Sequence, residues 1–137
     1  MNVGKKSKWS LSRHEFMTVY HYALQYSEWH DRLNALTDSV GTVASDGQPH
    51  GNYAGNPTEK LGIKRADLDE KINTVESTVK EAVADCEYMY PYLLRAVTDS
   101  DVTFDYLRMV MDLPCGKNVF YEHRRKFYYL LSKKLDL

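Results

Sequence analysis

Apolar residues recur every three or four positions along most of this chain, which is the pattern of amphipathic helices. The first such stretch predicts one long helix from about Leu11 to Thr37. Ser10 or Ser12 is the expected N-cap, and Glu15 falls in the first turn, where a carboxylate is favoured.

Residues 38–56 interrupt this pattern. They hold four glycines, one proline and several small polar residues, a composition that predicts a long loop. A loop of this length in a small domain is either a flexible connector or a functional segment. The sequence leaves both roles open.

The second helix has the clearest predicted start in the chain. Asn56 supplies an N-cap, Pro57 the first helical position and Glu59 the third. The apolar residues that follow have heptad spacing, which predicts a helix-packing seam formed by Leu61, Leu68, Ile72, Val75 and Val79. The partner of this seam is either the first helix or the same helix of a second subunit. The seam is expected to end near Asp85, because Pro91 cannot continue a helix.

Three shorter helices are predicted after residue 87. They cover about 88–97, then 104–111 behind Thr103 as N-cap, and then 117–135. No strand pattern is found, so the predicted fold is all-α. Residues 1–87 form a long helical hairpin or coiled-coil-like part that includes the flexible loop 38–56. Residues 88–137 are expected to form a helix-turn-helix region.

The net charge of −1 conceals a strong asymmetry. Residues 117–134 carry six Lys and Arg side chains against Glu122 alone, so this tail has a charge of +5. Residues 85–112 carry six acidic side chains against two arginines, a charge of −4. Because local fields decide where phosphate is attracted, the tail is the segment that favours nucleic acid.

The same tail has the apolar pattern of a helix-turn-helix. In that motif a first helix packs through a few apolar residues and a tight turn leads to a recognition helix. Phe104, Leu107 and Val110 or Met111 suit the first helix, and Leu113 would fill the turn. The second helix would bury Val119 or Phe120, His123, Phe127, Leu130 and Leu131.

The outward positions of this last helix carry the residue types that contact DNA. Arg, Lys, Asn and Glu side chains make directed hydrogen bonds to base edges, and cations hold phosphates. The predicted base readers are Lys117, Asn118, Tyr121, Glu122 and Arg125, and the predicted phosphate contacts are Arg124, Lys126, Lys133 and Lys134. The alternative is an ordinary solvated helix with an aromatic inner face.

Two segments carry a resemblance to a known family. Asn-Pro-Thr-Glu-Lys-Leu-Gly-Ile-Lys-Arg-Ala-Asp-Leu (56–68) and Leu-Pro-Cys-Gly-Lys-Asn-Val-Phe-Tyr-Glu-His-Arg-Arg-Lys-Phe-Tyr-Tyr-Leu-Leu (113–131) resemble phage transcriptional activators of the RinA/ArpU type. The second segment is also similar to region 4 of bacterial sigma factors (sigma-70 type). The resemblance covers the chain from about Tyr20 onward. One departure is Pro114-Cys115-Gly116, which replaces a Ser/Thr-rich opening and leaves more of the phosphate contact to Lys117 and Asn118.

This resemblance implies a DNA-binding regulator of late or packaging genes in a phage or prophage. Residues 117–126 would enter the DNA groove. The expected partners are double-stranded DNA, RNA polymerase as a further candidate, and a second copy of the chain through the seam. The expected location is the cytoplasm of a bacterial host, since no membrane-spanning run is present.

Catalytic and metal chemistry find no support in the sequence. The five histidines lack the spacing of a helical zinc site, and the glycines at 47, 51 and 55 form no phosphate-binding motif. No enzyme activity, cofactor or metal is therefore expected. Cys115 lies near a predicted helix N-terminus beside Lys117, which could lower its pKa, although a role in packing the turn is favoured.

A protein-interaction module is the alternative function. Tyr and Arg are enriched at the energetic centres of interfaces, and this chain has 11 tyrosines. Such a module would bind host or packaging machinery, or inhibit a defence nuclease, without specific DNA binding.

Overall fold

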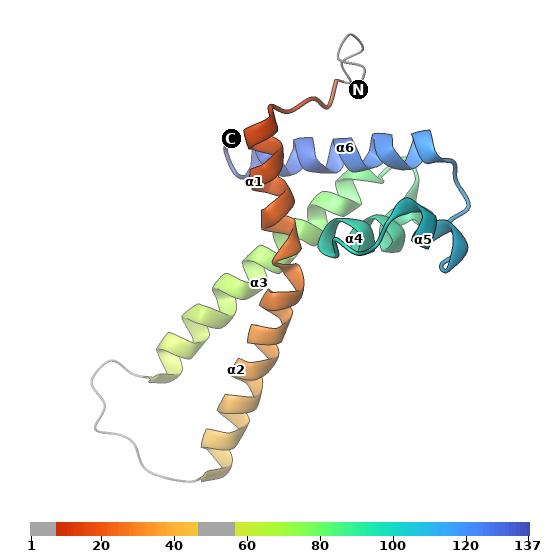
Figure 1. The fold of residues 1–137 in the computed structure, drawn as a ribbon. Coiled ribbons are helices and arrows are strands. Elements are labelled where there is room, and N and C mark those ends of the chain that lie inside the picture. The colour runs from red at the N-terminus through yellow and green to blue at the C-terminus, as the bar shows by residue number, and fades with distance from the viewer. Residues whose placement is uncertain (1–7, 47–56) are drawn as a thin grey trace. The chain divides into compact units, whose positions relative to one another are not determined.

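A computed structural model describes residues 8–46 and 57–137, and every regular element in these ranges is helical. The elements are α1 (Arg13–Leu24), α2 (Tyr26–Asp46), α3 (Pro57–Ala82), the 3₁₀ turn η1 (Glu87–Met89), α4 (Tyr90–Thr98), α5 (Phe104–Met109) and α6 (Lys117–Lys134) (Figure 1). The predicted all-α class is confirmed.

The chain divides into two compact units. The first contains Met1–Gln25 and Thr74–Leu137, and the second contains Tyr26–Asn73, so α3 contributes to both. The predicted boundary between residues 87 and 88 lies inside the first unit. The structure divides the chain differently because α6 packs against α1 as well as α4, which joins the N-terminal helix to the C-terminal region (Figure 1).

The first unit has a continuous apolar core. Burial of apolar side chains, which removes them from water, is the main stabilising contribution in a domain of this size. Its fully buried members come from α1, the end of α3, η1 and α4–α6, and include Val19, Ala23, Val75, Val79, Met89, Leu93, Val97, Leu107, Phe120, Phe127 and Leu131. The inner face of α6 is therefore part of this core.

The start of α1 follows the sequence prediction, but its length does not. Ser12 and Glu15 form a reciprocal capping box, each backbone N–H bonding the other side chain at 3.1 Å. The helix then ends at Leu24, so the prediction of a single helix through Thr37 is wrong. At Gln25 the backbone N–H bonds the carbonyl of Tyr22, which interrupts the α-helical pattern before α2 begins.

The predicted loop at 38–56 is wrong in its first half. Helix α2 continues to Asp46, and residues 47–56 lie outside the described part of the chain. Of the four glycines that predicted the loop, only Gly41 falls within α2. A single glycine costs a helix about 1 kcal/mol relative to alanine, which an established helix can absorb.

Helix α3 begins at Pro57 as predicted, whereas the proposed N-cap Asn56 lies outside the described residues. The helix ends at Ala82, a few residues before the predicted end of the seam. Four seam residues, Leu68, Ile72, Val75 and Val79, are buried in the single chain, and Leu61 is half-buried. Their burial does not require a second subunit, so the homo-oligomer stays a prediction.

None of the helices in the described ranges combines the length and apolar character needed to cross a lipid bilayer.

Candidate nucleic-acid interface

A short helix and a tight turn lead into α6. Thr103 caps α5, its hydroxyl accepting the backbone N–H of Tyr106 at 3.1 Å, as the sequence predicted. In the turn after α5, the backbone N–H of Leu113 donates to the carbonyl of Leu107, a residue of α5, at 3.0 Å. Both leucines are buried, so Leu113 fills the turn as expected. The turn passes through Asp112 at a φ of 57°, a left-handed conformation that Asp tolerates better than most residues.

Aromatic contacts hold α5 to the first turns of α6. The ring of Phe104 lies 5.7 Å from that of Phe120 and 6.1 Å from that of Tyr121. Such tilted ring pairs add to the free energy gained by burial. Phe120 is buried while Tyr121 is only half-buried, so this cluster joins the core to the surface of α6.

The first turns of α6 present an exposed polar face. Lys117 and Asn118 are exposed, and Arg125 lies two helical turns further along. The guanidinium of Arg125 donates to the carboxylate of Glu122 at 3.2 Å. The N-cap Gly116 offers no side-chain cap, which leaves the first N–H groups of the helix without one.

Arg124 has a different environment from its neighbours. Its guanidinium carbon lies 5.2 Å from the ring of Tyr128 and 6.0 Å from that of Tyr121, so its charge is held against aromatic faces. It also lines a cleft of about 180 Å³ with Tyr20, Asp99, Ser100 and Thr103. Burial raises the pKa of Tyr128, whose hydroxyl has no hydrogen-bond partner among the described residues. Arg124 is therefore oriented by aromatic packing.

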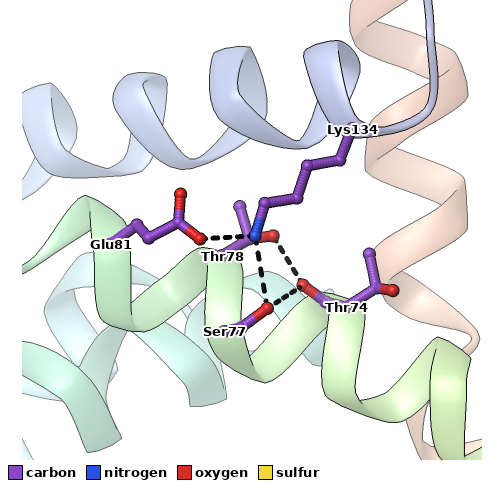
Figure 2. Close-up of polar contacts among 5 residues, drawn as sticks. All are labelled: Thr74, Ser77, Thr78, Glu81 and Lys134. Atoms are coloured by element: carbon purple, nitrogen blue, oxygen red, sulfur yellow. Dashed lines mark hydrogen bonds and ion pairs between the residues drawn. The ribbon is translucent and has the colours of Figure 1, made fainter.

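Lys134 does not present a free charge. Its ammonium donates to the carboxylate of Glu81 at 2.6 Å and to the hydroxyl of Ser77 at 3.2 Å (Figure 2). Ser77 in turn donates to the carbonyl of Thr74. The predicted phosphate contact at Lys134 is thus occupied by an interaction between α6 and α3.

His123 connects α6 to the segment after α3. One ring nitrogen lies 2.8 Å from the carbonyl of Val119 and the other 3.0 Å from the carboxylate of Asp85. Both partners are acceptors, so both contacts are hydrogen bonds only when the ring carries two protons. The hydrogen bond with His123 lowers the pKa of Asp85. One acidic residue of the 85–112 stretch therefore contacts the basic helix directly.

The second half of α6 contacts an N-terminal residue that the sequence reasoning missed. Trp9 lies 5.4 Å from the ring of Tyr129 and has the ammonium groups of Lys8 and Lys126 near its own ring. Lys133 lies over the ring of Tyr129 at 5.0 Å. The only sequence signal was the aromatic residue inside the basic N-terminal segment.

The thiol of Cys115 is half-buried in the turn before α6. Burial raises the pKa of Cys115, so the lowered pKa considered from its position beside Lys117 is not found. In the described part of the chain, no three His, Cys, Asp or Glu residues come together as metal ligands would.

Comparison of the chain with protein-family models, with curated proteins and with solved structures gives no match.

Proposed function

We propose that this chain is a DNA-binding transcription regulator in which α5, the turn at 110–116 and α6 act as a helix-turn-helix. The resemblance of residues 56–68 and 113–131 to phage activators extends the proposal to late or packaging promoters of a phage or prophage. RNA polymerase is a further proposed partner.

The division of α6 into two faces carries the proposal. Phe120, Phe127 and Leu131 are buried on the inner face, while Lys117, Asn118 and Arg125 are exposed on the outer face. A recognition helix needs this arrangement, because its base-contacting residues must be presented by a rigid element. The aromatic contacts of Phe104 add support, since they fix the first turns of α6 against α5.

The nine predicted contacts have different roles in this proposal. Lys117, Asn118 and Arg125 read base edges, with Tyr121 and Glu122 beside them. Lys126 and Lys133 contact phosphates. Arg124, which packs against the rings of Tyr121 and Tyr128, contacts a further phosphate. Lys134 has no DNA contact in this proposal, because its ammonium is held against α3 by Glu81 and Ser77.

Selection of bound sequences from a random duplex pool tests the proposal. The native chain should enrich one motif, and its affinity should fall steeply with salt. The combined substitution Lys117→Gln, Asn118→Ala and Arg125→Gln should abolish the enrichment. Lys80→Gln, which removes an exposed cation from α3, is the matched control and should leave it unchanged. Failure to bind any duplex at low salt, or the same motif from the triple variant, would refute the proposal.

One observation favours the alternative of a protein-interaction module. Met109 and Val110, at the end of α5, are 83% and 62% exposed. Adjacent exposed apolar side chains are typical of protein contacts when they belong to a larger apolar patch. Met109→Asp would then abolish capture of a host or packaging protein, whereas DNA selection with the same variant would succeed under the main proposal.

A further inference from the structure

We infer that Lys8 and Trp9 complete a second phosphate-binding surface with Lys126, Tyr129 and Lys133, and that this surface extends the DNA contact along the C-terminal half of α6. The inference rests on the proposed DNA-binding function. It adds an N-terminal contact that the helix-turn-helix itself does not contain.

Two aromatic rings build this surface. The rings of Trp9 and Tyr129 lie 5.4 Å apart with an interplanar angle of 59°. The contact places the segment before α1 against α6, and both rings are partly exposed. The ring pair therefore connects residues that are 120 positions apart in the sequence.

Three ammonium groups lie on these rings. Lys8 and Lys126 lie 4.9 and 5.4 Å from the ring centre of Trp9, and Lys133 lies 5.0 Å from that of Tyr129. A cation over an aromatic face is held by the ring quadrupole and keeps its full charge. The rings thus position the three cations without neutralising them.

Two other basic residues of α6 show the contrast. Lys134 is paired with Glu81 and Arg125 with Glu122. Within the described part of the chain, Lys8, Lys126 and Lys133 form no ion pair within 4 Å. The charge of Lys126 contributes to the lowered pKa of Asp85, whose carboxylate is hydrogen-bonded to His123. The surface therefore keeps a net positive charge.

A polyanion backbone is the ligand that this chemistry fits. Phosphates on a nucleic-acid strand are spaced regularly and need several neighbouring cations, whereas base stacking needs a free ring face. Here the aromatic rings already carry ammonium groups. The geometry thus favours contact with the phosphates of duplex DNA over stacking with bases.

The salt dependence of duplex binding tests the surface. Each phosphate contact that is lost reduces the slope of log affinity against log salt by about 0.9. Lys8→Gln should reduce the slope by about one, and Lys8→Gln combined with Lys126→Gln and Lys133→Gln by two to three units, roughly. Lys134→Gln is the matched control and should leave the slope unchanged. Trp9→Ala should weaken binding more than Trp9→Phe, which keeps a ring.

A second readout follows the surface directly. In an NMR titration with a short duplex, the indole N–H signal of Trp9 should shift while that of Trp29, which is 1% exposed, should not. Native slopes in the Lys8 and triple variants, each shown to be folded by circular dichroism, would overturn the inference while leaving the proposed function intact. Loss of all duplex binding by the native chain would overturn both. A Trp9 shift with phosphatidylserine-containing vesicles but not with duplex would assign the surface to a membrane and overturn the inference.

Discussion

The ammonium of Lys134 lies 2.6 Å from the carboxylate of Glu81, so the last turn of α6 is paired with the last turns of α3 (Figure 2). Both side chains are partly exposed, at 30% and 53%. Pairs of this kind contribute about 1 kcal/mol or less to folding. Their position joins the beginning of the 74–137 segment of the first unit to its end.

Lys134→Gln should therefore lower stability slightly and leave DNA affinity unchanged. The expected loss is below about 1 kcal/mol, because water and salt screen the pair. Denaturant unfolding of Lys134→Gln, Glu81→Gln and the double variant would give the coupling energy. Additive losses would show that the pair contributes nothing, and a reduced salt slope of DNA binding would show that Lys134 contacts phosphate.

The contact between Asp85 and His123 predicts an acid-sensitive contribution to stability. The hydrogen bond from His123 lowers the pKa of Asp85 from its ordinary 3.8, so the folded state favours the carboxylate. A lowered pKa stabilises the fold above the unfolded value, and that stability is lost as the pH falls through the folded value. Because the side chain is 68% exposed, the contribution should stay below about 1 kcal/mol.

Thermal unfolding measured from neutral to strongly acidic pH checks the prediction. Asp85→Asn should be less stable than the native chain at neutral pH, and the difference should vanish below the folded pKa of Asp85. Asp101→Asn, which removes an exposed carboxylate elsewhere, is the matched control. A constant difference between native and Asp85→Asn proteins down to strongly acidic pH would contradict the assignment.

Local signals explain which parts of the fold the sequence could predict. Ser12 with Glu15, Pro57 and Thr103 mark helix starts through interactions within a few residues, and all three starts agree with the structure. The heptad spacing likewise identified Val75 and Val79 as buried. These features depend on neighbours in the chain rather than on the tertiary fold.

The missed features depend on long-range contacts or on unusual local choices. The interruption at Gln25 has no Gly or Pro to mark it, and the left-handed turn residue is Asp112 where glycine is the usual signal. The contact of Trp9 with Tyr129 joins the two ends of the chain. The pairing of Lys134 with Glu81 likewise could not be read from the charge run in which Lys134 lies.

Gly116 offers a way to stabilise α6. It is the N-cap, its φ of −80° suits any residue, and a side chain there would meet open space. Gly116→Ser should supply the missing cap and restrict the unfolded chain, a gain of a few tenths to about 1 kcal/mol. Gly116→Ala gives the second effect without the cap, so the difference between the two melting temperatures isolates the hydroxyl. An equal gain in both variants would show that no cap forms.

Phe104 should affect DNA binding and stability together, because it joins α5 to the reading face of α6. Its ring contacts Phe120 and Tyr121, and it is only half-buried, so Phe104→Ala should cost about 1–3 kcal/mol. Far below the melting temperature, where the variant is folded, its duplex affinity should still fall, since the first turns of α6 lose their support.

Leu107→Ala provides the contrast to Phe104. Leu107 is the fully buried residue of α5, so its truncation should cost about 2–5 kcal/mol. Its side chain lies in the core of the unit, so a folded Leu107→Ala protein should bind duplex with nearly native affinity. Unfolding curves and anisotropy titrations on both variants would separate the two roles. Equal affinity losses per unit of destabilisation would mean that Phe104 is a core residue and has no special part in orienting α6.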